Sequence, residues 1–129
     1  MEGMIDSDRF GKGLCLEFSI AMKTILGYDI AVVYGVFEDK DGNEGDTYEI
    51  PSHTFSLHPK DKSLGIDCRG IRPITKIVSQ SGFIENPMKV KWKEDSMKNI
   101  IDLFGVEPDS EEIRKSIIFI KKNINVYKV

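Results

Sequence analysis

The sequence contains little cysteine and little histidine, with two of each among its 129 residues. Two cysteines are too few for a scaffold held by disulfides, and no secretion signal supports a bridge between Cys15 and Cys68. The cysteines also lack the close paired spacing of a structural zinc site. We therefore expect no metal or cofactor. We also expect two reduced thiols, each of which is either a buried core residue or a reactive nucleophile.

Long hydrophobic runs are absent as well. No apolar segment approaches the roughly 18 residues that a membrane-spanning helix requires. The opening residues, MEGMIDSDRF, are acidic and do not resemble a signal peptide. These two absences predict a cytoplasmic protein, or one exported without a cleaved signal peptide, with no membrane partner.

A clustered basic face is also missing, and the net charge is −3. The densest basic run, Lys89, Lys91 and Lys93, alternates with Val90 and Trp92. Such alternation is typical of the solvated face of a strand, whereas nucleic-acid binding needs a concentrated basic surface. We therefore expect no nucleic-acid partner.

The remaining composition and the order of segments indicate a single α+β domain spanning residues 1–129. A hydrophobic content of 40% and a charged content of 30% are ordinary for a globular protein. A helix precedes an antiparallel sheet, and a helical part follows over residues 94–129. Apolar spacing and turn residues predict helices at 13–26, 73–80, 95–104 and 109–123, and strands at 30–37, 53–57, 64–68 and 88–93.

Cys15 lies in the first turn of the helix predicted at 13–26. A thiol at that position is close to unsatisfied backbone N–H groups, which favour the thiolate and can stabilise an oxyanion on an attacked carbonyl. Gly11 and Gly13 have no side chains, so they leave the approach to the sulfur open. Glu17 points around the helix from the thiol, and we expect it at the surface or in a salt bridge.

A histidine and an aspartate lie on two segments that should pair as a hairpin. His53 opens an alternating strand and shares its face with Phe55, where it can accept the thiol proton. A turn at 59–63 returns the chain, which brings Asp67 level with His53 and lets its carboxylate orient the imidazole. Alternation sends Cys68 to the opposite face.

Each of these residues also has an ordinary structural interpretation. Cys15 is of a type often buried in cores, His53 fits a hydrogen-bonded strand histidine, and Asp67 fits a turn acceptor before a glycine. His58 is a rival base, but it precedes Pro59 at a turn and should face away. The ordered set of three residues favours chemistry over the separate interpretations.

Four segments, taken together, resemble the core of papain-like and transglutaminase-like cysteine enzymes. They are GLCLEFSIAMKTILG (13–27), AVVYG (31–35), HTFSL (53–57) and GIDCRGIRP (65–73). The spacings, 38 residues from Cys15 to His53 and 14 from His53 to Asp67, are similar to those of the transglutaminase-like core. The D-x-R-G segment at 67–70 resembles a DARG-like segment found in small bacterial and phage-associated proteins. The resemblance implies Cys15 as nucleophile, His53 as general base and Asp67 as orienting residue, on a catalytic helix packed against a small antiparallel sheet.

The same resemblance implies acyl transfer or hydrolysis at an amide bond of a protein or peptide, of the peptidase, amidase, deamidase or transglutaminase type. The stretch DSDRFGKG before Cys15 lacks the glutamine with which papain-like peptidases stabilise the oxyanion, which favours a narrow amidase or transferase over a general protease. The alternatives are a non-catalytic binding or effector module with the same fold, and a structural or assembly protein of a mobile element.

Overall fold

The computed structural model describes residues 15–39, 45–83 and 86–129, so Gly11 and Gly13 lie outside the described residues. The helices and strands are α2 (Cys15–Leu26), β1 (Ile30–Glu38), β2 (Thr47–Leu57), β3 (Leu64–Asp67), β4 (Gly70–Pro73), α3 (Ile74–Ser79), β5 (Lys89–Glu94), α4 (Met97–Phe104), α5 (Ser110–Lys122) and α6 (Ile124–Tyr127).

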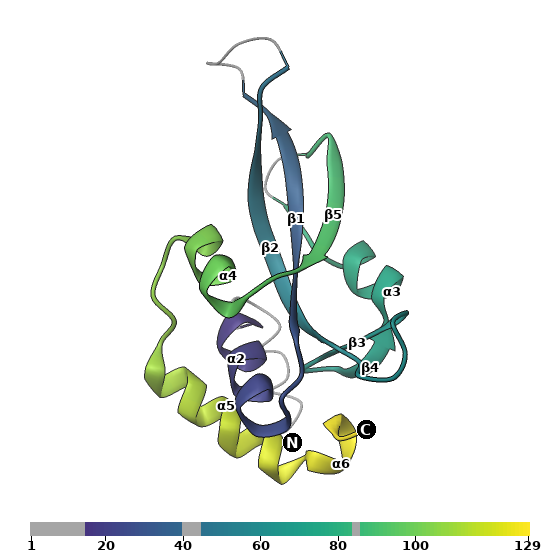
Figure 1. The fold of residues 1–129 in the computed structure, drawn as a ribbon, viewed down its shortest axis with the longest axis vertical. Helices are drawn as coiled ribbons and strands as arrows, with labels where there is room; N and C mark the ends of the chain where they lie inside the picture. The colour runs from purple at the N-terminus through teal and green to yellow at the C-terminus, as the bar shows by residue number, and fades with distance from the viewer. Residues whose placement is uncertain (1–14, 40–44, 84–85) are drawn as a thin grey trace.

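The strands that the structure describes form one five-stranded sheet in the order β4-β3-β2-β1-β5, and every neighbouring pair is antiparallel. The helices α2, α4 and α5 lie on one side of this sheet, and α3 lies on the other (Figure 1). An N-terminal helix, an antiparallel sheet and C-terminal helices confirm the predicted α+β class. In this order the lysine-rich segment, β5, is an edge strand.

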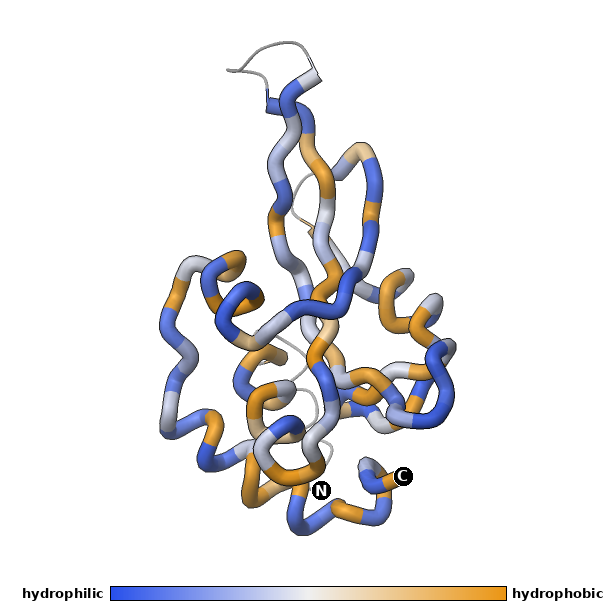
Figure 2. Tube along the Cα trace, in the orientation of Figure 1, coloured by the Kyte–Doolittle hydropathy of each residue, from blue (hydrophilic) through white to orange (hydrophobic). Residues whose placement is uncertain are grey.

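β1 supplies apolar side chains to both faces of the sheet. Ile30, Val32 and Tyr34 pack in a cluster with side chains of α2 and α4, while Ala31 and Val33 pack with α3. A strand covered on both faces needs an apolar side chain at nearly every position, which explains its continuous hydrophobic run. Hydrophobic residues accordingly concentrate where the sheet lies between helices, and polar residues are common toward the far end of the β1–β2 hairpin (Figure 2).

α2 lies between the sheet and α5 and is buried on most of its sides (Figure 1). The ring of Phe18 makes edge contacts with the rings of Phe119 and Tyr127, with centroid separations of 6.2 and 5.5 Å. Glu17 is buried too, and its Oε1 accepts a hydrogen bond from the Asp109 backbone N–H at 3.4 Å. The expectation of a surface position for Glu17 was therefore wrong, because α5 covers that side of the helix.

β2 starts earlier than the sequence pattern predicts. It begins at Thr47 and runs through Pro51, so His53 lies within the strand and does not open it. The β1–β2 register shifts between Val33 and Tyr34, where Val33 faces His53 and Tyr34 faces Pro51. Proline is tolerated in strands at such bulges, since no ladder hydrogen bond is required of it there.

The C-terminal helices begin and end largely as predicted. The side chain of Asp109 caps α5 by accepting from the backbone N–H groups of Glu111 and Glu112, and α4 stops at Gly105. The short strand β4 and the short helix α6 were not predicted, because four residues are too few to show a period.

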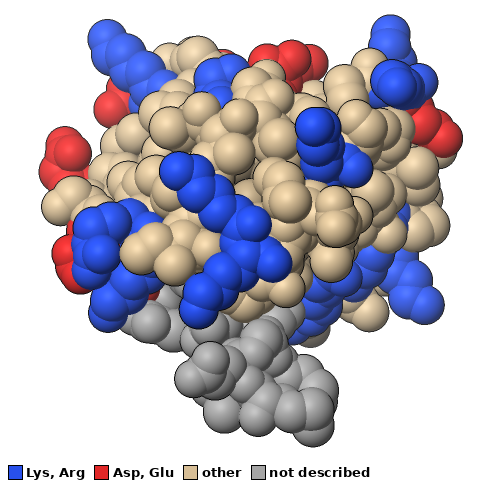
Figure 3. Space-filling model, turned by 90° about the horizontal axis from the view of Figure 1, so that it is seen from below, with Lys and Arg blue, Asp and Glu red and all other residues tan. Residues whose placement is uncertain are grey.

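The surface carries dispersed charges. Seen from below, lysine and arginine side chains are more prominent than acidic ones and are separated by uncharged surface (Figure 3). Every helix among the described residues is too short or too polar to cross a membrane.

We predict that Gly65→Ala destabilises the fold. A Cβ built at Gly65 would lie 2.7 Å from side-chain atoms of both Phe55 and Ile77, in the tightly packed layer between β3 and α3. Overpacking of this kind costs about 1–3 kcal/mol. Urea unfolding followed by circular dichroism should show a lower midpoint than for the native chain.

Gly82→Ala is the matched control. A Cβ at Gly82 meets no atom within 4 Å. This variant should therefore keep its unfolding free energy within about 1 kcal/mol of the native chain. Equal losses for the two alanine variants would contradict the packing argument.

Candidate active site

The site forms at a place where one edge of β2 is open. β3 pairs with β2 only at Ser56 and Leu57, so it does not cover the edge of β2 at His53. On its opposite edge, β2 pairs with β1, and the register of this pair shifts next to His53. Bulges of this kind change the direction of neighbouring side chains. A histidine that shares the sheet face of Phe55 can therefore meet Cys15, which comes from the helix on the opposite face.

Asp67 is the last residue of β3, and both of its carboxylate oxygens have hydrogen-bond partners. Its Oδ2 lies 3.3 Å from His53 Nε2 and accepts a hydrogen bond from Arg72 Nη2 at 2.6 Å. Its Oδ1 accepts the backbone N–H of Arg69 at 3.0 Å. The Asp67 side chain is only 3% exposed. A carboxylate so far from water is stable only with such partners, since burying an unpaired charge is costly.

The Cys15 thiol lies close enough to the side chain of His53, and to the backbone and side chain of Thr54, for each of them to lower its pKa. The hydroxyl of Thr54 also lies 2.8 Å from that of Ser19, and both are buried. Ser19 is one helical turn after Cys15, so the two residues share a face of α2. Thr54 thus connects the helix to β2 directly beside the thiol.

These contacts shift the pKa values of the three groups. Burial acts to raise the pKa of the Cys15 thiol, but the hydrogen bond and charge of His53, together with the contacts of Thr54, lower it below its ordinary value. Burial acts to lower the pKa of His53, but hydrogen bonds with Asp67 and Cys15 raise it to about 9. Near neutral pH this arrangement favours a thiolate beside an imidazolium.

The pKa of Asp67 is also displaced. Burial acts to raise it, and the hydrogen bonds from His53 and Arg72, with the charge of Arg72, lower it below its ordinary value. Asp67 therefore stays ionised and opposite the imidazolium, where it can hold the ring in one orientation.

The other candidates from the sequence lie elsewhere. His58 Nδ1 accepts hydrogen bonds from the backbone N–H groups of Lys60 and Asp61, so this histidine shapes the turn after β2. Cys68 is buried in the cluster that contains Phe18 and Ile66. Neither Cys15 nor Cys68 forms a disulfide within the described part of the chain.

Sequence reasoning missed the residues that support the triad, above all Arg72. In the β3–β4 hairpin Asp67 pairs with Gly70 and Gly65 pairs with Arg72. Residues that pair across two strands have their side chains on the same face of the sheet. The partners of Asp67 and Arg72 are both glycines, so no partner side chain separates the Arg72 guanidinium from the Asp67 carboxylate. The signal was present in GIDCRGIRP, but it needed the position of β4, which was not predicted.

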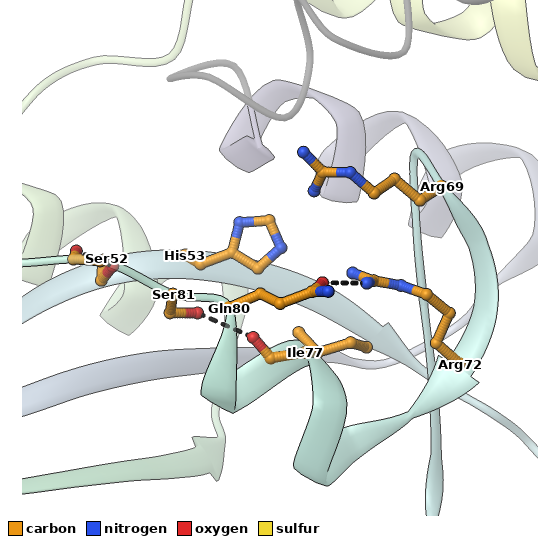
Figure 4. A pocket seen from close by; sticks show the side chains of 8 residues that line it. Ser52, His53, Arg69, Arg72, Ile77, Gln80 and Ser81 are labelled. Carbon is orange, nitrogen blue, oxygen red and sulfur yellow. Dashed lines mark hydrogen bonds between the residues drawn. The ribbon is translucent and has the colours of Figure 1, made fainter.

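A cavity of about 480 Å³ opens beside the imidazole. Two arginines from the β3–β4 hairpin and side chains from α3 and the segment after it surround its mouth (Figure 4). The Arg72 guanidinium, which holds Asp67, also donates to the side-chain oxygen of Gln80. The lining residues are Ser52, His53, Arg69, Arg72, Ile77, Gln80, Ser81 and Gly82.

Within residues 15–39, 45–83 and 86–129, no group of three or more histidine, cysteine or acidic side chains could hold a metal ion. The described residues instead place the Cys15 thiol beside the His53 imidazole, and that imidazole beside the Asp67 carboxylate.

Comparison with known proteins gives no relative for this chain, since no family model, curated protein or solved structure matches it.

We predict that iodoacetamide alkylates Cys15 faster than Cys68 at pH 7, because only Cys15 has an imidazole beside it. His53→Ala should slow the alkylation of Cys15 at least about tenfold, since only the contacts of Thr54 then oppose the effect of burial on the thiol pKa, and each pKa unit gained removes about nine-tenths of the thiolate. Peptide mass spectrometry after timed labelling measures the rate at each cysteine.

His58→Ala is the control, because it removes a histidine that makes its contacts in the turn. It should leave the labelling rate of Cys15 unchanged. Slow and equal labelling of both cysteines in the native chain would show that the thiol is not activated.

Proposed function

We propose that this protein is a small thiol hydrolase that cleaves an amide bond through a thioester on Cys15. The observation that carries the proposal is the continuous chain of contacts from the Cys15 sulfur through His53 to the buried carboxylate of Asp67. Together with the order of the three residues in the sequence, it supports membership of the papain-like and transglutaminase-like cysteine enzymes.

In the first half-reaction the Cys15 thiolate attacks the carbonyl carbon of the amide. A carbon–sulfur bond forms and the carbonyl oxygen becomes an oxyanion, for which backbone N–H groups at the start of α2 are the proposed donors. The tetrahedral intermediate then breaks its carbon–nitrogen bond. The imidazolium of His53 gives its proton to the leaving nitrogen, so an amine departs and a thioester remains.

In the second half-reaction a water molecule attacks the thioester. The neutral imidazole of His53 takes one proton from the water as the new carbon–oxygen bond forms. The carbon–sulfur bond then breaks, and the acid leaves a thiolate beside an imidazolium, as at the start. Asp67 stabilises the imidazolium in both steps and keeps the ring oriented, with Nε2 toward the carboxylate and Nδ1 left for the thiol.

Water is the proposed acceptor because the cavity beside His53 is open and lined mainly by polar side chains. In a transglutaminase, an amine substrate would have to occupy this cavity and attack the thioester in place of water.

We predict that a library of fluorogenic peptidyl amides contains substrates that the native chain hydrolyses and that Cys15→Ala and His53→Ala hydrolyse at least about 100-fold more slowly. Adding hydroxylamine should divert the thioester to a hydroxamate, detectable by mass spectrometry, because hydroxylamine is a stronger nucleophile than water. The fluorescence assay measures turnover for each variant.

Cys68→Ala is the matched control, since it removes the other thiol while leaving the triad intact. Its turnover should equal that of the native chain. Turnover that persists in Cys15→Ala would reject the thioester route, and a native chain that alkylates rapidly but turns over no amide would favour the binding module.

We predict that kcat/KM falls as the pH rises above about 9, because His53 has a pKa of about 9 and its imidazolium is needed to protonate the leaving amine. On the acid side, activity should rise through the lowered pKa of Cys15 as the thiolate forms. Asp67→Asn removes a charge and a hydrogen bond that raise the pKa of His53, so the alkaline limb should move to lower pH.

Asp61→Asn is the control for this change, since Asp61 is exposed and its carboxylate accepts hydrogen bonds from Ser63 in the turn after β2. It should leave both limbs in place. An alkaline limb that does not respond to Asp67→Asn would contradict the role of the carboxylate.

A further inference from the structure

The cavity beside His53 is surrounded by polar side chains, most of which are already used. Ser52 Oγ donates to the Gly82 carbonyl at 2.7 Å, and Ser81 Oγ donates to the Ile77 carbonyl at 3.0 Å (Figure 4). A hydroxyl that donates inside the protein offers a ligand only an acceptor.

Arg72 and Gln80 are committed to each other and to the triad. The guanidinium of Arg72 reaches Gln80 on one side and Asp67 on the other. Its charge is balanced by that buried carboxylate, and its side chain is only 17% exposed. Arg72 therefore serves to position Asp67 and is not available to a ligand.

Arg69 is different, because among the described residues its guanidinium has no ion-pair partner. The side chain is exposed, lines the cavity and extends over it toward the imidazole of His53 (Figure 4). Its backbone is nevertheless fixed, since the Arg69 N–H donates to Asp67 Oδ1 in the turn between β3 and β4. The backbone of Arg69 is thus fixed beside His53, and its guanidinium has no ion-pair partner among the described residues.

The neighbouring cavity, of about 530 Å³, has the opposite character. It shares Ser52 and Gly82 with the first but is lined by Phe37, Tyr48 and Phe83. No charged side chain is among its described lining residues. An anionic group near the triad would therefore be bound on the side of Arg69.

We propose that Arg69 determines substrate specificity by binding a carboxylate close to the amide bond that Cys15 attacks. This inference rests on the proposed function, and it assigns the substrate to amides that carry an acidic group, such as an acidic peptide. A guanidinium matches a carboxylate with two parallel N–H donors, and the pair is stronger in a cavity than in open solvent.

The test uses reagents that alkylate Cys15 with loss of chloride and differ only in charge. Chloroacetyl-glutamate amide carries a side-chain carboxylate, and chloroacetyl-glutamine amide carries a neutral amide of the same shape. The native chain should react with the first about tenfold faster, the value expected for a charged hydrogen bond, and added salt should reduce the preference. Peptide mass spectrometry gives the rate at Cys15 for each reagent.

Arg69→Gln should abolish the preference without changing the rate with iodoacetamide, and Arg69→Lys should keep part of it. Arg114→Gln is the matched control, because Arg114 is an exposed arginine of α5 that pairs with Glu111. It should retain the full preference. An equal rate with the two reagents in the native chain, or a preference that survives Arg69→Gln, would overturn the inference.

A third reagent, chloroacetyl-phosphoserine amide, distinguishes a carboxylate site from a phosphate site. Faster alkylation by this reagent than by the glutamate reagent, with dependence on Arg69, would overturn the assignment to a carboxylate. Slow alkylation of Cys15 by every reagent, iodoacetamide included, would instead reject the proposed function. The two failures are therefore distinguishable.

Discussion

The site depends on one buried carboxylate. Asp67 is almost completely removed from water, and its two oxygens are occupied by the imidazole of His53, the guanidinium of Arg72 and the backbone N–H of Arg69. Removing any one of these partners would leave part of a buried charge uncompensated, which is far more costly than losing a surface ion pair. The same carboxylate acts together with Cys15 to raise the pKa of His53, which favours a protonated imidazole beside the thiol.

The fold meets this constraint by bringing together residues from opposite faces of a sheet. Cys15 belongs to a helix on one face, whereas His53, Asp67 and Arg72 project from the other. They can meet because β3 covers only the end of β2, and because a bulge changes the direction of the strand at His53. A regular sheet with full-length strands would separate the thiol from the imidazole. The irregularity is therefore the part of the fold that allows Cys15 and His53 to come together.

Sequence reasoning could select Cys15, His53 and Asp67 as residues that lie together because each is marked by a local pattern: a cysteine at a helix start, a histidine in an alternating segment and an aspartate on the next strand. It placed the start of β2 incorrectly, because Pro51 usually marks a strand boundary and here lies in a bulge. It missed Arg72 because that residue acts through pairing with a strand of four residues. It missed Thr54 because a buried hydroxyl gives no periodic signal distinct from its neighbours. Interactions between separate elements, unlike local patterns, depend on register.

The C-terminal helices also support the site, although none of Cys15, His53 and Asp67 comes from them. The hydroxyl of Tyr127 donates to the Cys68 carbonyl at 2.7 Å, and that carbonyl lies in the turn between Asp67 and Arg69. Burial raises the pKa of Tyr127, so its hydroxyl remains protonated and able to donate. One turn thus carries both Asp67 and Arg69, and the hydroxyl of Tyr127, far along the chain, fixes the backbone between them. The precision of a site built on a short hairpin comes from the helix packed beneath it, which explains why this small domain continues beyond the strands that hold its reactive groups.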